Sequence, residues 1–235
     1  VFHGAGFTVG GMAKGSGMIH PNLATMLAVV TTDYPLEPGE AIDFLRPAVD
    51  ASFNSISVDG ECSTNDAVVL LASGEAAIER TPATDAELAL AIRTVCAELA
   101  QQVVADGEGA TLLAEIAVSG AASAPEARAI AQRIATSSLV KTALFGRDAN
   151  WGRVLAAAGY SGARFSPDRA EIWFSGLPVY RRGVALAFDE AEAKARLDRA
   201  EVTVRIHMHA GKAATWMWTC DLTEGYVKVN GSYRT

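Results

Sequence analysis

Hydrophobic residues follow two different periods along this chain of 235 residues. Between residues 84 and 105 they recur every three or four positions, which predicts an amphipathic helix. These positions are Leu88, Ile92, Val95, Leu99 and Val103. A capping box at 84–87 predicts the start of this helix, and Gly107 predicts its end. Between residues 201 and 209 apolar and polar residues alternate instead, which predicts a half-buried strand.

The rest of the pattern interleaves further strands and helices. Strands are expected at residues 7–9, 26–32, 67–73, 111–120, 214–222 and 226–230. Helices are expected at 40–53, at 125–138 and after a cap at Asn150, and Pro47 predicts a kink or a late start in the first of these. The run 67–73 is apolar except for its last residue, which is typical of a strand buried on both faces.

Turns rather than crossover helices join many of these strands. This connectivity favours mixed sheets with helices packed outside them, an α/β fold of the α+β type. The chain is long enough for two domains. We expect a boundary near Leu112, giving domains of residues 1–112 and 113–235.

Composition narrows the classes of function. Half of the residues are hydrophobic, 20% are charged and the net charge is −7. Nothing forms a Lys/Arg stripe, which argues against nucleic acid as a partner, and no apolar run approaches a membrane span. Three widely spaced cysteines fit unpaired thiols in a reducing cytoplasm. Because the chain begins at Val1, we expect that an N-terminal part of a longer protein is absent.

The usual cofactor motifs do not fit. The spacing Gly4-x-Gly6-x-x-x-Gly10 departs from the dinucleotide fingerprint, and Lys14 is followed by glycine where a P-loop needs Ser or Thr. We therefore expect no nucleotide cofactor. His207 and His209 share one face of the predicted strand, but no nearby ligand completes a metal site, so a solvated edge is the better interpretation.

An acidic cluster and a threonine remain as candidates for chemistry. Asp59, Glu61 and Asp66 lie within eight residues, and a hairpin turn with side-chain-to-backbone bonds explains them better than acid–base catalysis. A threonine that becomes a chain terminus carries its own base, its free α-amine. Thr25 follows Ala24 after a glycine-rich loop, although its spacing equally suits the start of a strand.

Five blocks of sequence resemble the glutamate N-acetyltransferase / ornithine acetyltransferase family of arginine biosynthesis. The blocks are "GGMAKGSGMIHPNLATML", "SVDGECSTND", "DGEGAT", "FGRDANWGRVLAAAGYSG" and "CDLTEGYVKVNGSYRT". The resemblance implies an α-β-β-α sandwich-like catalytic part and a smaller C-terminal α/β domain whose tail returns to the active site. It implies self-cleavage between Ala24 and Thr25. It also implies acetyl transfer from N-acetylornithine to glutamate through Thr25, without a cofactor, and some members accept acetyl-CoA as a donor.

The same resemblance assigns substrate contacts to Lys14, Thr25, Glu108, Asn230 and Thr235. Lys14 suits a substrate carboxylate, and Glu108 suits an amino group such as that of ornithine. Asn230 can bond either group. As ordinary residues, these would be a loop lysine, a helix-end acid and a strand-end amide. The C-terminal residue, Thr235, would fray unless it is tied down.

The resemblance also implies a partner α chain and an α2β2 assembly. In the family a Thr-Gly pair far upstream of the cleavage site supplies the oxyanion hole, and this sequence starts after that region. Losing such donors costs about 3–4 kcal/mol of transition-state stabilisation. Two alternatives therefore stay open: a self-cleaving aminopeptidase or amidase that releases its acyl group to water, and an inactive fragment.

Overall fold

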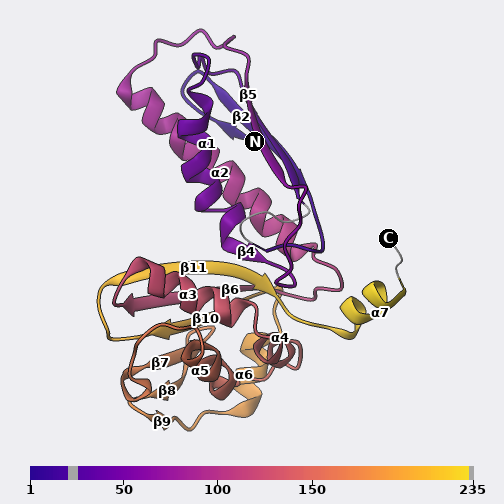
Figure 1. Cartoon of the computed structure of the whole chain (residues 1–235), viewed down its shortest axis with the longest axis vertical. Coiled ribbons are helices and arrows are strands. Elements are labelled where there is room, and N and C mark those ends of the chain that lie inside the picture. The colour runs from indigo at the N-terminus through magenta and orange to yellow at the C-terminus, as the bar shows by residue number, and fades with distance from the viewer. Residues whose placement is uncertain (21–25, 233–235) are drawn as a thin grey trace. The chain divides into compact units, whose positions relative to one another are not determined.

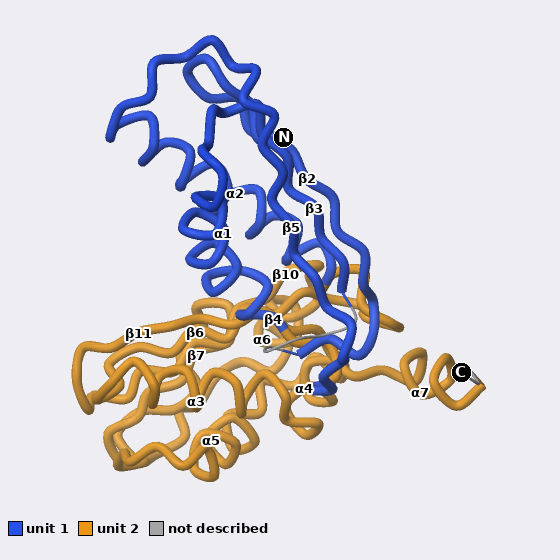
Figure 2. The backbone as a smooth tube through the Cα atoms, turned by 45° about the horizontal axis from the view of Figure 1, so that its top comes forward, with its two compact units in different colours: residues 1–56, 60–103 blue, residues 57–59, 104–235 orange. Residues whose placement is uncertain are grey.

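The computed structural model describes residues 1–20 and 26–232, which form two compact units. Unit 1 contains residues 1–56 and 60–103, and unit 2 contains residues 57–59 and 104–235 (Figures 1 and 2). The stretch from Val104 to Leu112 therefore belongs to unit 2, whereas the boundary expected near Leu112 assigns it to the first domain.

Unit 1 is built on a four-stranded sheet with the order β1-β2-β3-β5. Its strands are β1 (Phe2–His3), β2 (Thr8–Lys14), β3 (Leu27–Thr32) and β5 (Ala67–Ala72). Two helices, α1 (Ala41–Asp50) and α2 (Pro82–Ala105), pack on one face of it. A Cβ at Gly11 of β2 would lie 3.0 Å from the Leu99 side chain, so the missing side chain lets α2 come this close to the sheet.

The opposite face of this sheet is apolar and exposed. Met12, Leu27, Val69 and Leu71 expose 73%, 53%, 42% and 55% of their surface. The expectation that the run 67–73 is buried on both faces is therefore wrong, because Leu70 is the one buried residue of β5. Only the face that meets the helices removes apolar side chains from water.

By length and composition alone, helix α2 is long and apolar enough to cross a membrane. The sequence led us to expect that no apolar run is long enough for this. The apolar face of α2 nevertheless packs against other residues of this chain. Leu88, Ile92 and Val95 are buried, and Val95 lies against Gly11 of β2. The helix also starts earlier than the predicted capping box: Thr81 Oγ1 accepts a hydrogen bond from the Thr84 N–H at 3.2 Å, and Pro82 opens the first turn.

Unit 2 is built on a mixed sheet with the order β11-β6-β10-β7-β8-β9, and the two-residue strand β4 (Ile56–Ser57) lies beside β11. The strands are β6 (Leu113–Ala121), β7 (Glu171–Phe174), β8 (Leu177–Arg181), β9 (Val184–Ala185), β10 (Glu201–His207) and β11 (Ala213–Cys220). The helices are α3 (Ala124–Ala135), α4 (Ser138–Phe145), α5 (Trp151–Gly159), α6 (Glu190–Leu197) and α7 (Glu224–Ser232).

The alternating pattern of β10 is confirmed. Val202, Val204 and Ile206 are buried, and Val204 pairs in register with Ile116 of β6. The same core contains Ile130 of α3. The predicted cap of α5 is confirmed as well, since Asn150 Oδ1 accepts a hydrogen bond from the Arg153 N–H at 3.1 Å.

The strand predicted at 226–230 is wrong, because these residues lie in helix α7. The signal for a helix was present in the sequence. Thr223 precedes the segment, and its Oγ1 accepts a hydrogen bond from the Tyr226 N–H at 3.2 Å, as an N-cap does. The alternation of Tyr226, Val227, Lys228 and Val229 is too short to outweigh that cap.

Candidate active site

In unit 1, strand register places Lys14 beside the chain that follows Thr25. Lys14 is the last residue of β2, is exposed and pairs with Leu27, the first residue of β3. Leu27 lies two residues after Thr25 in the sequence. The expected cleavage residues Ala24 and Thr25 lie outside the described residues, and so does the expected substrate contact Thr235.

The residue after Thr25 is fixed from two sides. Asp66 Oδ1 accepts a hydrogen bond from the Met26 N–H at 2.8 Å, and the Met26 carbonyl accepts one from the Ala67 N–H at 3.1 Å. Burial raises the pKa of Asp66, and the hydrogen bond from Met26 opposes that rise. Sequence reasoning grouped Asp66 with a local turn, but its partner is 40 residues away. The acidic cluster gives no sign that β3 and β5 pair, and this pairing brings Asp66 to Met26.

The predicted local bonds also occur in this region. Ser63 Oγ accepts a hydrogen bond from the Asn65 N–H at 3.2 Å, which closes a short side-chain turn. Asp59 belongs to unit 2 and Asp66 to unit 1, and their described contacts differ. The structural interpretation of the acidic cluster therefore holds for the turn, while Asp66 supports the segment next to Thr25.

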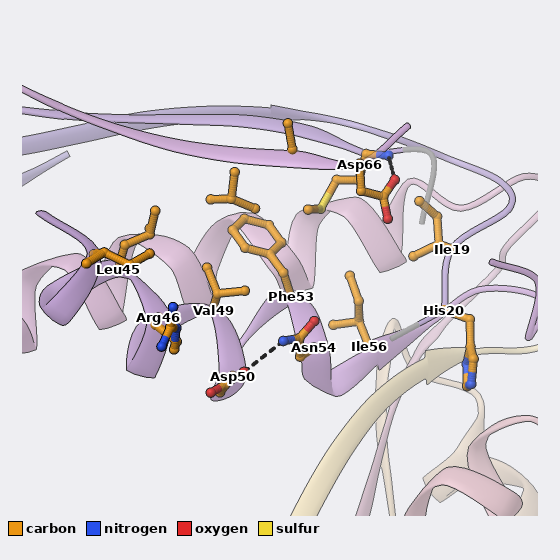
Figure 3. A pocket seen from close by; sticks show the side chains of 14 residues that line it. Ile19, His20, Leu45, Arg46, Val49, Asp50, Phe53, Asn54, Ile56 and Asp66 are labelled. Atoms are coloured by element: carbon orange, nitrogen blue, oxygen red, sulfur yellow. Dashed lines mark hydrogen bonds between the residues drawn. The ribbon is translucent and has the colours of Figure 1, made fainter. Parts of the chain in front are cut away.

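Beside Met26 lies a largely apolar pocket of about 470 Å³ within unit 1 (Figure 3). Its lining residues are Ile19, His20, Met26, Ile42, Leu45, Arg46, Val49, Asp50, Phe53, Asn54, Ile56, Asp66, Ala67 and Val68. Its polar or charged lining residues are His20, Arg46, Asp50, Asn54 and Asp66. Asn54 donates a hydrogen bond from Nδ2 to Asp50 Oδ1 at 2.8 Å. A mainly apolar lining with some polar groups is typical of small-molecule sites.

In unit 2, the structure brings together two of the predicted substrate contacts. Asn230 Nδ2 donates a hydrogen bond to Glu108 Oε2 at 2.8 Å and another to the Tyr226 carbonyl at 3.1 Å. Glu108 lies in the turn after α2, and Asn230 lies on α7, so residues 122 positions apart meet. An amide that donates to a carboxylate restricts its orientation and leaves its other lone pairs able to accept hydrogen bonds.

Gly109 lets the two segments touch. Its φ is +68°, and a Cβ there would lie 2.3 Å from the Tyr226 nitrogen and 2.6 Å from the Gly225 carbonyl carbon. Thr223 Oγ1 donates to the Gly109 carbonyl at 2.6 Å, and Tyr226 Oη donates to Asp59 Oδ2 at 3.2 Å. The turn that carries Glu108 therefore lies directly on the first turn of α7.

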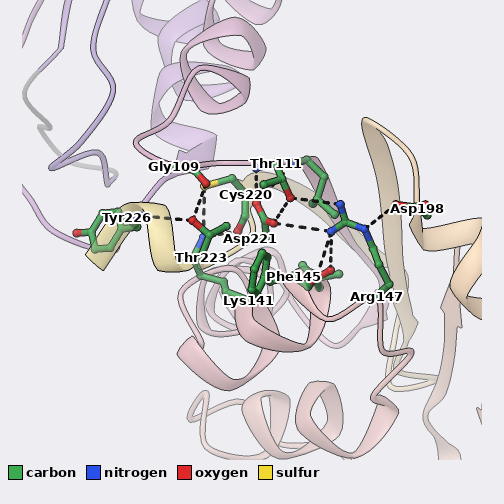
Figure 4. A network of polar contacts seen from close by, with 12 residues as sticks. Gly109, Thr111, Lys141, Phe145, Arg147, Asp198, Cys220, Asp221, Thr223 and Tyr226 are labelled. Carbon is green, nitrogen blue, oxygen red and sulfur yellow. Dashed lines mark hydrogen bonds and ion pairs between the residues drawn. The ribbon is translucent and has the colours of Figure 1, made fainter. Parts of the chain in front are cut away.

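A buried polar network supports this turn from the next residues along the chain (Figure 4). The buried Asp221 carboxylate accepts the Thr111 N–H at 2.8 Å and the Thr111 hydroxyl, and Arg147 lies 3.8 Å away as an ion-pair partner. The neighbouring Lys141 donates to Thr219 Oγ1 at 3.1 Å and to the Cys220 carbonyl. Burial lowers the pKa of Lys141, and the Cys220 thiol opposes that change.

The histidine pair makes its described contacts within unit 2. Ser119 Oγ and His207 Nδ1 are 2.8 Å apart, the His207 and His209 rings meet edge to face, and His209 pairs with Glu171 at 3.3 Å. Burial, together with positive charge at His209 and Arg205, lowers the pKa of His207. Within residues 1–20 and 26–232, no group of three or more His, Cys, Asp or Glu side chains could hold a metal ion. The pair lies outside the contacts of Glu108 and Asn230.

Comparison with known proteins gives one consistent family. The model of the ArgJ family matches residues 1–235. The arginine biosynthesis bifunctional protein ArgJ of Symbiobacterium thermophilum is 51% identical over 235 residues, which is 99% of this chain and 58% of that protein. The protein of the same name from Geobacillus kaustophilus is 46% identical over 97% of this chain and 56% of its own length. The chain thus spans a little over half of these relatives.

A solved structure is similar as well. The arginine biosynthesis bifunctional protein argJ of Bacillus halodurans superposes with a TM-score of 0.82 at 40% identity. The match covers 86% of this chain and 97% of that one. Its fold is therefore shared over nearly all of the Bacillus chain.

Proposed function

The chain belongs to the ArgJ family, and from this premise we propose that it forms part of an acetyltransferase of arginine biosynthesis. The proposed reaction moves the acetyl group of N2-acetylornithine to glutamate and yields ornithine and N-acetylglutamate. The observation that carries the proposal is the family match over all 235 residues, which includes each block that the sequence analysis singled out. The proposal includes a cytoplasmic location for this protein.

Self-cleavage between Ala24 and Thr25 is the second part of the proposal, and chain lengths support it. The match of 235 residues is 58% of the Symbiobacterium protein, so that protein has about 400 residues. The Bacillus match covers 86% of 235 residues, about 202, and this is 97% of a chain of about 208. The Bacillus chain is therefore about half as long as the Symbiobacterium protein, as a product of cleavage would be.

In the proposed reaction, the free α-amine of Thr25 takes the proton of its own hydroxyl. The Thr25 oxygen then attacks the acetyl carbonyl carbon of N2-acetylornithine, the carbon–nitrogen bond breaks, and ornithine leaves with the proton. Glutamate reverses these steps: its amine attacks the acetyl-threonine ester and releases the threonine hydroxyl. An α-amine with a pKa near 7.7–8.0 is suited to this proton transfer at neutral pH.

On this proposal, described residues of both units supply substrate contacts. Exposed Lys14, at the end of β2, serves as a point charge for a substrate carboxylate. Glu108, oriented by Asn230, takes the side-chain ammonium of the ornithine moiety. Thr235, which lies outside the described residues, is the remaining contact in the proposal. The proposed partners are the family's own α chain in an α2β2 assembly, and acetyl-CoA is a second acetyl donor in the proposal.

The test uses the complete protein as its gene encodes it. Labelled acetyl groups should move from N2-acetylornithine to glutamate, and Thr25→Ala should stay uncut and transfer nothing. Thr25→Ser keeps a hydroxyl and should cut and transfer more slowly. Release of free acetate at a rate independent of glutamate would replace the proposed transferase with an amidase. Equal transfer by Thr25→Ala would remove the proposed nucleophile.

A further inference from the structure

Helix α7 carries Asn230 without any apolar anchor of its own. None of its residues 224–232 is buried, and Val227 and Val229 expose 65% and 45% of their surface. A helix of nine residues is marginal by itself in water, because its nucleation is unfavourable. The position of Asn230 therefore depends on polar contacts at the start of the helix.

The contacts at that start converge on one side chain. Thr223 is 6% exposed, and its hydroxyl makes two hydrogen bonds. It accepts the Tyr226 N–H at 3.2 Å, which caps α7, and it donates to the Gly109 carbonyl at 2.6 Å, which holds the turn next to Glu108. A hydroxyl has one proton to donate and two lone pairs to accept with, so both bonds fit one orientation.

The same hydroxyl thus couples the two partners of the Glu108–Asn230 hydrogen bond. The hydroxyl binds the turn 107–110 through the Gly109 carbonyl, and it binds the first turn of α7 through the Tyr226 N–H. The Tyr226 hydroxyl adds a bond to Asp59 Oδ2, which steadies the helix but does not reach the turn with Glu108. Loss of the Thr223 hydroxyl would therefore remove one hydrogen bond from each of the two segments at once.

We propose that Thr223 is a positioning residue for the amine-binding pair Glu108–Asn230, and thereby sets how tightly the ornithine moiety binds. The proposal rests on the proposed function, since it takes the ornithine ammonium as the ligand of Glu108. Thr223 acts through its neighbours: its bonds go to the backbone of Gly109 and Tyr226, and it shifts no proton of the reaction. Its removal should weaken binding and leave the chemical step at Thr25 intact.

The experiment compares Thr223→Val, which keeps the shape, with Thr223→Ser, which keeps the hydroxyl, in the complete protein. Thr223→Val should raise KM for N2-acetylornithine about tenfold, equal to about 1.4 kcal/mol of binding. Its kcat should stay within about twofold of the parent value, since transition-state contacts at the acetyl group are unchanged. Thr223→Ser should restore KM to within about threefold. Thr94→Val, at a half-buried threonine of α2, is the matched control and should change neither constant.

Two further measurements distinguish a wrong role for Thr223 from a wrong assignment of the amine site at Glu108. The ornithine Kd, measured by calorimetry on the same variants, should follow KM. If Thr223→Val leaves both unchanged while Glu108→Gln raises them, the positioning role is wrong and the site stands. If Glu108→Gln also leaves them unchanged, the amine site itself is wrong and the inference falls with it. If Thr223→Val does not fold, Thr223→Ala takes its place: its KM for N2-acetylornithine should rise in the same direction, and an unchanged KM there would overturn the inference.

Discussion

Replacing Gly109 by alanine should destabilise unit 2 more than replacing another glycine that also has a positive φ. At Gly109 φ is +68°, and a Cβ would lie 2.3 Å from the Tyr226 nitrogen. Real Cβ atoms keep at least 3.0 Å from such atoms, so the turn and α7 must separate by 0.7 Å or more. That movement would lengthen the Thr223–Gly109 and Asn230–Glu108 hydrogen bonds, which are 2.6 and 2.8 Å long.

The expected loss in the free energy of unfolding of Gly109→Ala has two contributions. Left-handed backbone costs alanine about 1–2 kcal/mol relative to glycine, and two weakened hydrogen bonds add about 1–2 kcal/mol. Gly109→Ala should therefore reduce the free energy of unfolding by about 2–4 kcal/mol. Gly162 has a φ of +86°, and nothing lies within 4 Å of the position that a Cβ would take there. Gly162→Ala should therefore lose only the backbone part, about 1–2 kcal/mol.

Urea unfolding followed by tryptophan fluorescence measures this difference within one unit. All four tryptophans, at 151, 173, 216 and 218, belong to unit 2, so the signal reports the unit that holds both glycines. The two variants should differ by about 1 kcal/mol or more. Equal losses for the two glycines would refute the close approach of the turn to α7, and with it the structural basis for the Glu108–Asn230 pair.

Three further predictions test other parts of the account. Asp221→Asn should destabilise unit 2 by about 2–4 kcal/mol in the same urea assay, because a buried carboxylate loses its charge beside Arg147; a loss under about 0.5 kcal/mol would contradict the network. Since the folded-state pKa of His207 lies below its unfolded value near 6.5, the unfolded chain binds more protons below pH 6.5. Stability is then full above pH 6.5 and falls below it, and His207→Gln should flatten this fall in thermal melts from about pH 7 to about pH 5. In the complete protein, Lys14→Met should raise KM for glutamate and N2-acetylornithine, with Lys14→Arg intermediate; an unchanged KM would exclude the proposed carboxylate contact.

Sequence periodicity was sufficient where one face of an element is buried by its own unit. The alternation in β10 and the cap at Asn150 were both correct, because burial of Val202, Val204 and Ile206 and a local side-chain bond decide those elements. Periodicity failed for the run 67–73, since an apolar run does not reveal which face has a partner. It also failed for α7, where a single capping threonine outweighs four alternating residues.

The candidate site shows the same division. Residue types suggested Glu108 and Asn230 only through resemblance to a family, because the contact between them spans 122 positions and depends on the backbone approach at Gly109. The support that Asp66 gives to the Met26 N–H was missed for a similar reason, since strand pairing creates it. Local sequence contains the signals for caps such as those at Asn150 and Thr223, whereas it contains no such signal for these long-range contacts.

The central claim is that Thr25 becomes both a new chain start and the carrier of the acetyl group. Intact mass of the complete protein, measured before and after incubation with N2-acetylornithine in the absence of glutamate, tests both parts together. The account predicts a chain that begins at Thr25 and gains one acetyl group, located on residue 25 by fragmentation and lost when glutamate is added. An uncut protein, or a cut chain whose acetyl group is on another residue, would contradict it.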